Sequence, residues 1–273
     1  MSEVIPFIVA PAAACLILAV IMAYFGLHVL RREIIFIDLS MAQLAALGTT
    51  LAFVMDIPLD SPQSQFFSLG LIIVGACFFS LVRFTIPMVP QEAIIGIIYV
   101  VSSALAILAV DQTPHGAEHI KDLLNGSILW ITWAGVLKLI GISVLVGGFH
   151  WKFQHHFLEI SNNYREKLSK NQFGWDFLFY LSLGLIVVVS VKSAGIFLIF
   201  SFLIIPAACG LIFSKNFFNQ WVIGAAVGAL GSILGITFST VSDLPTGSAL
   251  VTVLGALFLI SLLLSKIGVK KGQ

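Results

Sequence analysis

The stretch EIIFIDLSMAQLAALGTTLAF, Glu33 to Phe53, is long and apolar enough to cross a lipid bilayer as a helix, yet it contains Asp38 and Gln43. About 20 apolar residues in a helix span the hydrocarbon core of a membrane. An acidic residue at the centre of such a helix costs about 2.5–3.5 kcal/mol on insertion scales. The stretch therefore predicts a transmembrane helix whose polar side chains have either a partner or a function.

The composition of the whole chain is that of an integral membrane protein. Of its 273 residues, 59% are hydrophobic and 10% are charged, and the mean hydropathy is +1.07. A soluble globular domain has about 25% charged residues. The formal net charge of +1 indicates no particular partner. Cys15, Cys77 and Cys209 lie in separate apolar runs, which predicts buried hydrophobic side chains and not a disulfide framework or a zinc site.

Apolar runs recur along the chain and predict an all-α integral membrane protein with about eight or nine transmembrane helices. No segment between the runs is long enough for an independent soluble core, so we expect one transmembrane domain over residues 1–273. If the first or last run does not span the membrane, the number is eight. We place the spans near residues 5–27, 34–54, 66–84, 93–110, 128–148, 174–191, 195–213, 219–239 and 247–264.

Basic residues in alternate connecting segments predict the orientation of the chain. The segments 55–65, 111–126 and 239–247 are acidic or neutral apart from Lys121, so we expect them outside. Because cytoplasmic loops are enriched in Lys and Arg, the N-terminus is predicted outside and the C-terminus in the cytoplasm. The basic residues on the predicted cytoplasmic side are Arg31, Arg32, Arg83, Lys152, Arg165, Lys167, Lys170, Lys215, Lys266, Lys270 and Lys271.

Glycine spacing predicts close packing in the eighth span. Gly224, Gly228, Gly231 and Gly235 are spaced by 4, 3 and 4 residues, which places them along one ridge of a helix. Such a ridge lets a neighbouring helix approach closely. In the preceding span, Pro206 interrupts a long apolar helix and is expected to kink it.

The sequence contains no phosphate-binding loop of the form G-x-x-x-x-G-K-[ST]. If ATP drives this protein, another chain must hydrolyse it. We therefore expect that the chain is not an enzyme and holds no cofactor of its own.

Four blocks of sequence resemble the permease subunit of the ABC-3 family, the zinc and manganese ABC importers. They are GLHVLRREIIFIDLSMAQLAALG (26–48), QEAIIGIIYVVSSALAIL (91–108), LLNGSILWIT (123–132), and KSAGIFLIFSFLIIPAACGLI (192–212) followed by SDLPTGSALV (242–251). Together they extend across nearly the whole chain in the family's order. The resemblance implies a homodimeric permease for a divalent transition metal in a bacterial plasma membrane. It also implies two ATP-binding cassette subunits, which bind ATP and Mg²⁺, and an extracellular or periplasmic metal-binding protein.

The family's Asp-x-x-x-His motif in the second helix is not preserved here. The matching positions are Leu39 and Gln43, and Asp38 is displaced by one residue. Asp38 lies about 140° around an ideal helix from Gln43, so the two need another helix to share an ion. Because an amide oxygen is a weaker zinc ligand than imidazole, the substrate is not necessarily zinc. Asp38 either pairs with Arg31 or Arg32 or lies on the translocation path.

The resemblance makes Asp38, Gln43, Glu92 and Asp243 candidates for the translocation path. Glu92 follows Pro90 at the start of the fourth helix, where an acid is favoured by the helix dipole, so capping is the alternative to metal contact. Asp243 precedes Pro245 in SDLPTG, where a turn-forming role is the alternative to a role at the external entrance.

An external segment offers a second set of candidate metal ligands. His115 and His119 would share one face of a helix, and Glu118 and Asp122 another, which suits capture of a transition-metal ion. Because Pro114 and Gly116 favour a loop, solvated loop histidines are the alternative.

The resemblance also implies that a short cytoplasmic helix, here around residues 207–219, docks into a groove on the ATPase. Phe217 and Phe218 are the expected anchors. The loop SNNYREKLSKNQFGW (161–175) departs from the family pattern, which is expected to alter ATPase recognition. The full set of expected coupling residues is Pro206, Ser214, Lys215, Asn216, Phe217 and Phe218.

Other classes of function remain open from the sequence. A secondary transporter would couple intramembrane acids to protons and show an internal repeat, and we find no convincing repeat. An intramembrane hydrolase would carry a His-Glu-x-x-His or paired-Asp motif in its spans, and neither is found there. A permease for a metal chelate, in place of a free ion, is the third alternative.

Overall fold

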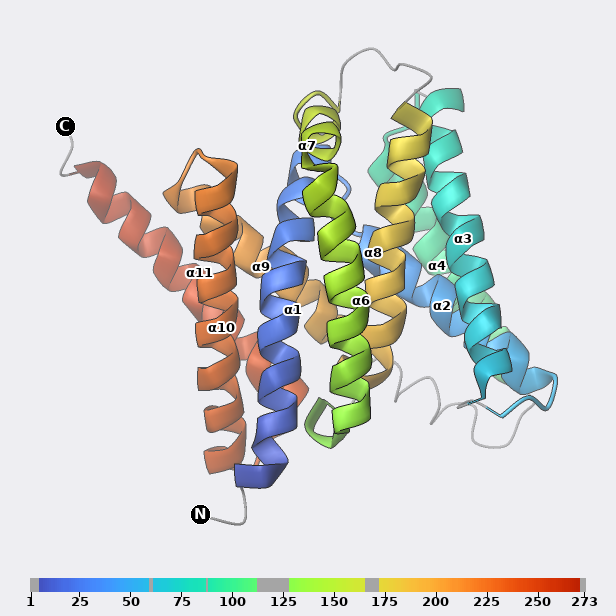
Figure 1. Cartoon of the computed structure of the whole chain (residues 1–273), viewed down its shortest axis with the longest axis horizontal. Helices are drawn as coiled ribbons and strands as arrows, with labels where there is room; N and C mark the ends of the chain where they lie inside the picture. Colours follow the sequence, from blue (N-terminus) through green and yellow to red (C-terminus); the bar gives the residue numbers. More distant parts are fainter. Residues whose placement is uncertain (1–4, 59–60, 87, 112–127, 165–171, 271–273) are drawn as a thin grey trace. The chain divides into compact units, whose positions relative to one another are not determined.

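The structure, a computed structural model, describes residues 5–58, 61–86, 88–111, 128–164 and 172–270 (Figure 1). Within these ranges the chain forms helices and no strand. The helices are α1 (Ile5–Arg32), α2 (Ile37–Val54), α3 (Pro62–Thr85), α4 (Gln91–Val110), the 3-10 turn η1 (Ile128–Trp130), α6 (Trp133–Lys152), α7 (Gln154–Asn162), α8 (Gln172–Ala194), α9 (Ile196–Phe213), α10 (Phe217–Ser242) and α11 (Thr246–Lys270).

Nine of the helices in the described ranges are long and apolar enough to cross a membrane, and α7 is not among them. They correspond one to one with the nine predicted spans, so the predicted fold class is confirmed. The largest difference at a helix end is in α11, which continues to Lys270 although the apolar run was expected to end near residue 264. Helical backbone hydrogen bonds continue past the apolar residues, which explains why hydropathy alone placed this end too early.

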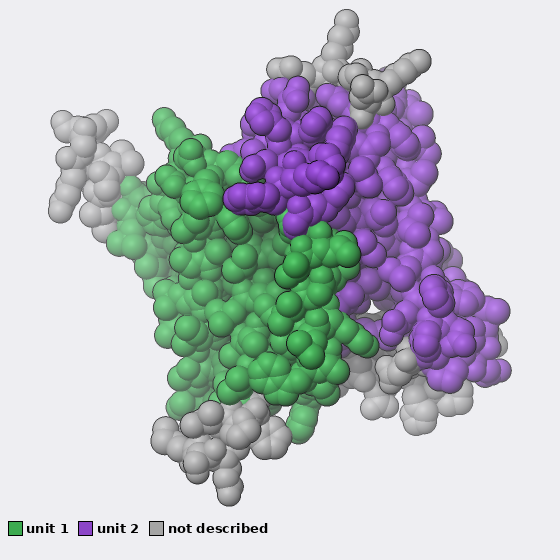
Figure 2. All heavy atoms as spheres, viewed as in Figure 1, with its two compact units in different colours: residues 1–30, 125–147, 193–273 green, residues 31–124, 148–192 purple. Residues whose placement is uncertain are grey.

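The chain folds into two compact units, each built from segments that are distant in sequence (Figure 2). Unit 1 contains Met1–Leu30, Asn125–Gly147 and Ser193–Gln273, and unit 2 contains Arg31–Leu124 and Gly148–Lys192. The single transmembrane domain over residues 1–273 stays a prediction.

In unit 1, α10 packs against α9 and α11 along its glycine ridge. A Cβ atom at Gly224 would lie 2.8 Å from the carbonyl oxygen of Pro206, and one at Gly228 would lie 2.8 Å from the Cβ of Ala19. Cβ atoms at Gly231 and Gly235 would lie 2.4 and 2.7 Å from leucine side chains of α11. These distances leave no room for a side chain, so the predicted helix-helix contact is confirmed.

In unit 2, α2 packs against both α3 and α4. Gly48 lets α3 approach, because a Cβ atom there would lie 2.7 Å from the carbonyl oxygen of Phe67. Ser68 of α3 donates a hydrogen bond to the carbonyl of Ala45 at 3.0 Å, and its hydroxyl lies 2.7 Å from that of Thr49. Small and hydroxyl residues therefore hold these helices together, as is common where helices pack within a membrane.

Candidate functional site

Asp38 and Gln43 are both buried in α2, which is the most buried of the membrane-spanning helices in the described ranges. Asp38 is 1% exposed and lies in the first turn of the helix. Its expected pairing with an arginine is not found among the described residues, because Arg32 binds Asp176 and Arg31 donates to Asn162 at 2.9 Å. Asp38 is thus a buried carboxylate with no arginine beside it.

Glu92 lies in the first turn of its own helix, α4, as expected, and its side chain also caps a second helix. Its Oε1 accepts a hydrogen bond at 3.1 Å from the backbone N–H of Phe36, the residue that precedes α2. Its own helix begins after Pro90 without a side-chain cap. A carboxylate from α4 therefore satisfies a free backbone donor at the N-terminus of α2.

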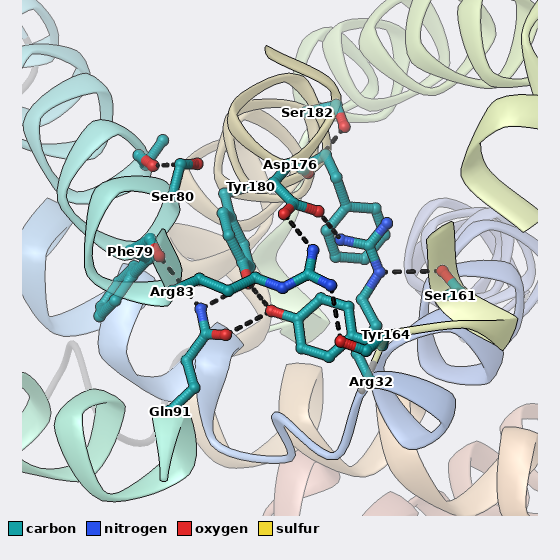
Figure 3. Close-up of polar contacts among 12 residues, drawn as sticks. Arg32, Phe79, Ser80, Arg83, Gln91, Ser161, Tyr164, Asp176, Tyr180 and Ser182 are labelled. Carbon is teal, nitrogen blue, oxygen red and sulfur yellow. Dashed lines mark hydrogen bonds and ion pairs between the residues drawn. The ribbon is translucent and has the colours of Figure 1, made fainter. Parts of the chain in front are cut away.

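A buried ionic cluster lies at one end of unit 2 and joins α1, α3 and α8 (Figure 3). Asp176 of α8 is 0% exposed and binds two arginines. Arg32 donates to one of its oxygens at 2.9 Å, and Arg83 of α3 donates to the other. The two guanidinium groups also stack on aromatic rings, Arg32 at 3.8 Å from the ring centre of Phe179 and Arg83 at 3.5 Å from that of Tyr164.

Hydrogen bonds extend this cluster to α4 and to the segment after α7. The hydroxyl of Tyr164 donates to Gln91 and lies 2.7 Å from the hydroxyl of Tyr180, and Arg83 donates to the carbonyl of Tyr164 at 2.6 Å. Burial raises the pKa of Tyr164 to about 12, and the charge on Asp176 acts in the same direction. Tyr164 is therefore a neutral hydrogen-bond donor at physiological pH.

Sequence reasoning did not identify Asp176, Gln91, Tyr164 or Tyr180. One signal was present: Asp176 is an acid inside an apolar run, and the insertion cost that drew attention to Asp38 applies to it as well. Its partner Arg32 lies 144 positions away in sequence, so spacing could not reveal the pair.

The expected coupling segment is a tight turn between two long helices, and not a separate short helix. In place of a helix around residues 207–219, α9 continues to Phe213 and α10 begins at Phe217. The turn is stabilised by Asn216, whose side chain accepts from the backbone N–H groups of Phe218 at 3.0 Å and Asn219 at 3.2 Å. Asn216 is thus an N-cap that starts a new helix where the resemblance implied continuation.

The two expected anchors of the coupling segment differ in their surroundings. Phe217 is half-buried, with its ring centre 5.8 Å from that of Tyr24 and 5.1 Å from that of His28. Phe218 is 56% exposed. Lys215 and Asn216 are exposed, Ser214 is half-buried and Pro206 is buried within α9. Within this turn, Phe218 is the aromatic residue whose ring is accessible to a partner.

Asp243 ends α10 in the left-handed conformation, with φ of 53° and ψ of 42°. Its backbone N–H donates to the carbonyl of Ser239, and the hydroxyls of Ser239 and Thr246 lie 2.8 Å apart across the turn. Asp is one of the few residues other than Gly that adopt this conformation readily. The turn-forming role expected for Asp243 is thus present in the structure.

The candidate external ligands His115, Glu118 and His119 lie outside the described residues. Among the residues that the structure does describe, no group of three or more His, Cys, Asp or Glu side chains is arranged to hold a metal ion. A metal site in the described part of the chain would therefore need ligands of other kinds, such as amide or backbone oxygens, or a second chain.

Comparisons with known proteins give consistent matches. The sequence model of the ABC 3 transport family matches residues 4–265. A "Probable metal transport system membrane protein" of Chlamydia trachomatis is 26% identical over 185 residues, which cover 64% of this chain and 61% of that protein. The "Manganese transport system membrane protein MntC" of Listeria monocytogenes is 25% identical over 177 residues, covering 64% and 63%. The matched part of the chain thus spans about three fifths of the length of these relatives.

A longer match and two solved structures extend these findings. The "Manganese import system permease protein ScaB" of Streptococcus parasanguinis is 25% identical over 224 residues, covering 78% of this chain and 75% of that protein. The structure of "PsaBC from Streptococcus pneumoniae in complex with Fab" superposes with a TM-score of 0.73 at 19% identity, covering 93% and 90% of the two chains. A "putative metal-chelate type ABC transporter" superposes with a TM-score of 0.67 at 18% identity, covering 93% and 84%. At these identities the structural matches show the fold.

Proposed function

The chain belongs to the ABC 3 transport family, and on that premise we propose that it is the membrane-spanning permease subunit of an ATP-driven importer for a divalent transition-metal ion. The observation that carries the proposal is the family match over residues 4–265, which contain all nine helices that are able to cross a membrane. The substrate class is supported by the relatives, whose names specify metal or manganese transport.

Within this class, manganese is favoured over zinc. In α2, Gln43 stands where the family pattern has an imidazole, and two other candidates, the buried Asp38 and the half-buried Glu92, provide carboxylate oxygens. Mn²⁺ prefers carboxylate and carbonyl oxygens, whereas Zn²⁺ is bound well by imidazole and thiolate. Two of the named relatives are manganese permeases.

The importer requires partners that supply energy and substrate. We expect two copies of this chain, two ATP-binding cassette subunits that hold ATP and Mg²⁺, and an extracellular or periplasmic metal-binding protein. ATP binding would close the two cassettes, displace the turn between α9 and α10, and alternate the access of a central path. Of the two expected anchors, the exposed Phe218 is the one through which this turn would contact the cassette.

The chain lies in the plasma membrane in this proposal, with the N-terminus outside and the C-terminus in the cytoplasm. The described ranges contain nine helices that are long and apolar enough to cross a membrane, and this supports the arrangement because an odd number of spans places the termini on opposite sides. The distribution of Lys and Arg assigns the sides.

Uptake by purified components tests this function. The chain and its ATPase are placed in liposomes, and entry of Mn²⁺, Zn²⁺ and Fe²⁺ is measured with and without ATP. We expect ATP-dependent uptake, fastest for Mn²⁺, that stops when the ATPase is inactivated by mutation. Uptake at full rate without the ATPase, or driven by a proton gradient alone, would show a secondary transporter. Uptake of a metal only as its chelate would contradict the proposed substrate.

A further inference from the structure

Asp38 is a buried carboxylate without a hydrogen-bond partner in the described part of the chain. The residue is 1% exposed, and both Oδ1 and Oδ2 are buried and unpartnered. No hydrogen bond from the described residues reaches either of these oxygens. Burying an ionised carboxylate in this way is strongly unfavourable unless a positive group joins it.

Glu92 supplies a second carboxylate at the same place. Its Oε1 accepts from the N–H of Phe36, two residues before Asp38, whereas Oε2 is buried with no partner among the described residues. The hydroxyl of Ser40 donates to the carbonyl of Ile95 at 2.8 Å, which holds the first turns of α2 and α4 side by side. Glu92 thus reaches the start of α2, the helix whose first turn contains Asp38.

The local charges do not balance. Two carboxylates contribute two negative charges, and the N-termini of α2 and α4 each contribute about half a positive charge. No lysine, arginine or histidine forms an ion pair with either carboxylate in the ranges that the structure describes. The site therefore presents three unpartnered oxygens, namely Asp38 Oδ1, Asp38 Oδ2 and Glu92 Oε2, with no cationic side chain to satisfy them.

We propose that Asp38 and Glu92 together bind one divalent metal ion between the first turns of α2 and α4. The identification of this ion with the transported metal rests on the proposed function. Three carboxylate oxygens suit a hard or borderline cation such as Mn²⁺, and one ion can contact all of them, whereas a single proton shared between two oxygens leaves the third without a partner. If the orientation deduced above holds, this site lies near the cytoplasmic end of α2, where an imported ion would leave the protein.

Glu92 also caps α2 through the N–H of Phe36, whereas Asp38 makes no hydrogen bond to the described residues. Substitutions can therefore separate the loss of charge from the loss of the cap. Glu92→Gln keeps an oxygen that accepts from Phe36 N–H but removes the charge. Glu92→Ala removes both the charge and the cap. Asp38→Asn preserves the size of the side chain and removes the other charge. Glu159→Gln, an exposed acid on α7, is the matched control.

The test counts Mn²⁺ ions bound by the purified chain in complex with its ATPase, using electron paramagnetic resonance of free Mn²⁺. We expect Asp38→Asn and Glu92→Gln each to weaken one binding site by about tenfold or more, a large effect on the scale of binding free energies, and Glu159→Gln to leave binding unchanged. Glu92→Ala should in addition lower the melting temperature, whereas Glu92→Gln should not.

The outcomes for the site and for the function are distinguishable. Unchanged Mn²⁺ binding in both Asp38→Asn and Glu92→Gln would overturn the site, even if the wild-type complex imports Mn²⁺. Loss of one bound ion in these variants would support the site, even if liposomes showed no ATP-dependent uptake, and in that case the proposed function would fail alone. In a domain of this size, a change of about 1 kcal/mol shifts the melting temperature by about 2–4 °C. A variant that melts within about 2 °C of the wild type is therefore folded, and misfolding is excluded as the cause of a lost site.

Discussion

Asp176 is the residue that compensates the two buried arginines of unit 2. It is the only described carboxylate that pairs with Arg32 and Arg83, and all three side chains are buried or nearly so. Removing one member of a buried charge cluster leaves the others without compensation, which costs more than the cluster contributes in net stability.

We therefore predict that Asp176→Asn lowers the free energy of unfolding by about 3–5 kcal/mol. Two guanidinium groups would then remain buried without a counter-charge. The measurement is the melting temperature in detergent, with the exposed Glu159→Gln as control. If Asp176→Asn had the same melting temperature as the wild type, water or lipid headgroups would already compensate the charges of the two arginines.

Asp243 allows backbone and charge to be tested separately. Because it occupies the left-handed region, Asp243→Ala should destabilise the chain by about 1 kcal/mol, whereas Asp243→Gly and Asp243→Asn should be close to neutral. Uptake is the second measurement. If Asp243→Asn melts normally but imports metal slowly, the carboxylate acts at the external entrance, and if its uptake is normal the residue only forms the turn.

At this scale the sequence indicated which polar residues to examine but not what they contact. Asp38 was recognised as an acid inside an apolar run, and Glu92 from its place at a helix start. Their relation to each other was not, because the fourth helix could be placed next to the second only once the packing of Ser40 on Ile95 was known. The expected pairing of Asp38 with Arg32 was wrong, because Arg32 forms its ion pair with Asp176 of α8.

Among the elements, α1 and α9 make the closest helix contact in unit 1. A Cβ atom at Gly26 would lie 1.8 Å from the carbonyl oxygen of Leu203, which no side-chain motion can relieve because that oxygen belongs to the backbone. A close approach of this kind is possible only where one helix has no side chain.

Gly26→Ala is accordingly predicted to prevent stable folding or to cost at least about 1–3 kcal/mol through backbone shifts. The yield of monodisperse protein and its melting temperature measure this. Gly255→Ala is the control, because a Cβ atom there meets nothing within 4 Å. Equal behaviour of the two variants would mean that α1 and α9 separate readily.

The turn between α9 and α10 gives a prediction about coupling. Phe218→Ala should weaken binding of the ATPase by about tenfold or more while leaving the melting temperature unchanged, because the ring is exposed. Phe217→Ala should lower the melting temperature, because its ring packs on Tyr24 and His28. Affinity for the ATPase and melting curves of the two variants separate the roles, and the reverse pattern would contradict this assignment.

The elements were predicted more completely than their ends. Nine apolar runs gave nine helices, because length and hydropathy alone decide whether a helix can cross a bilayer. The expected coupling helix was wrong, because the side chain of Asn216 starts α10 and the apolar pattern gives no sign of such a cap. Helix α7 was not predicted either, since its 9 residues are too few for a membrane-type pattern.

For the whole molecule, the orientation in the membrane is a prediction with a direct test. A fluorescent protein fused after Gln273 should be fluorescent, and alkaline phosphatase fused at the same position should be inactive, because the C-terminus is predicted in the cytoplasm. The opposite pattern would place the basic segments outside and would move the Asp38–Glu92 site to the other side of the membrane.

The division into two units could not have been predicted from the sequence. Each unit takes up segments from early and late in the chain, and the boundaries at Leu30 and at Gly147 fall inside continuous helices. Hydropathy reports whether a helix crosses the membrane but not which neighbour it meets, because lipid tails and leucine side chains are equally apolar.

The hairpin formed by α9 and α10 has little internal freedom at its turn. Gln220 donates to the carbonyl of Ser214 at 2.7 Å, and a Cβ atom at Gly210 would lie 2.2 Å from the carbonyl oxygen of Gln220. The opposite ends of these two helices are set by Gly195, with φ of 79°, and by Asp243, with φ of 53°. We therefore expect a displacement of the turn to move α9 and α10 together, so that its effect reaches the backbone at Gly195 and Asp243.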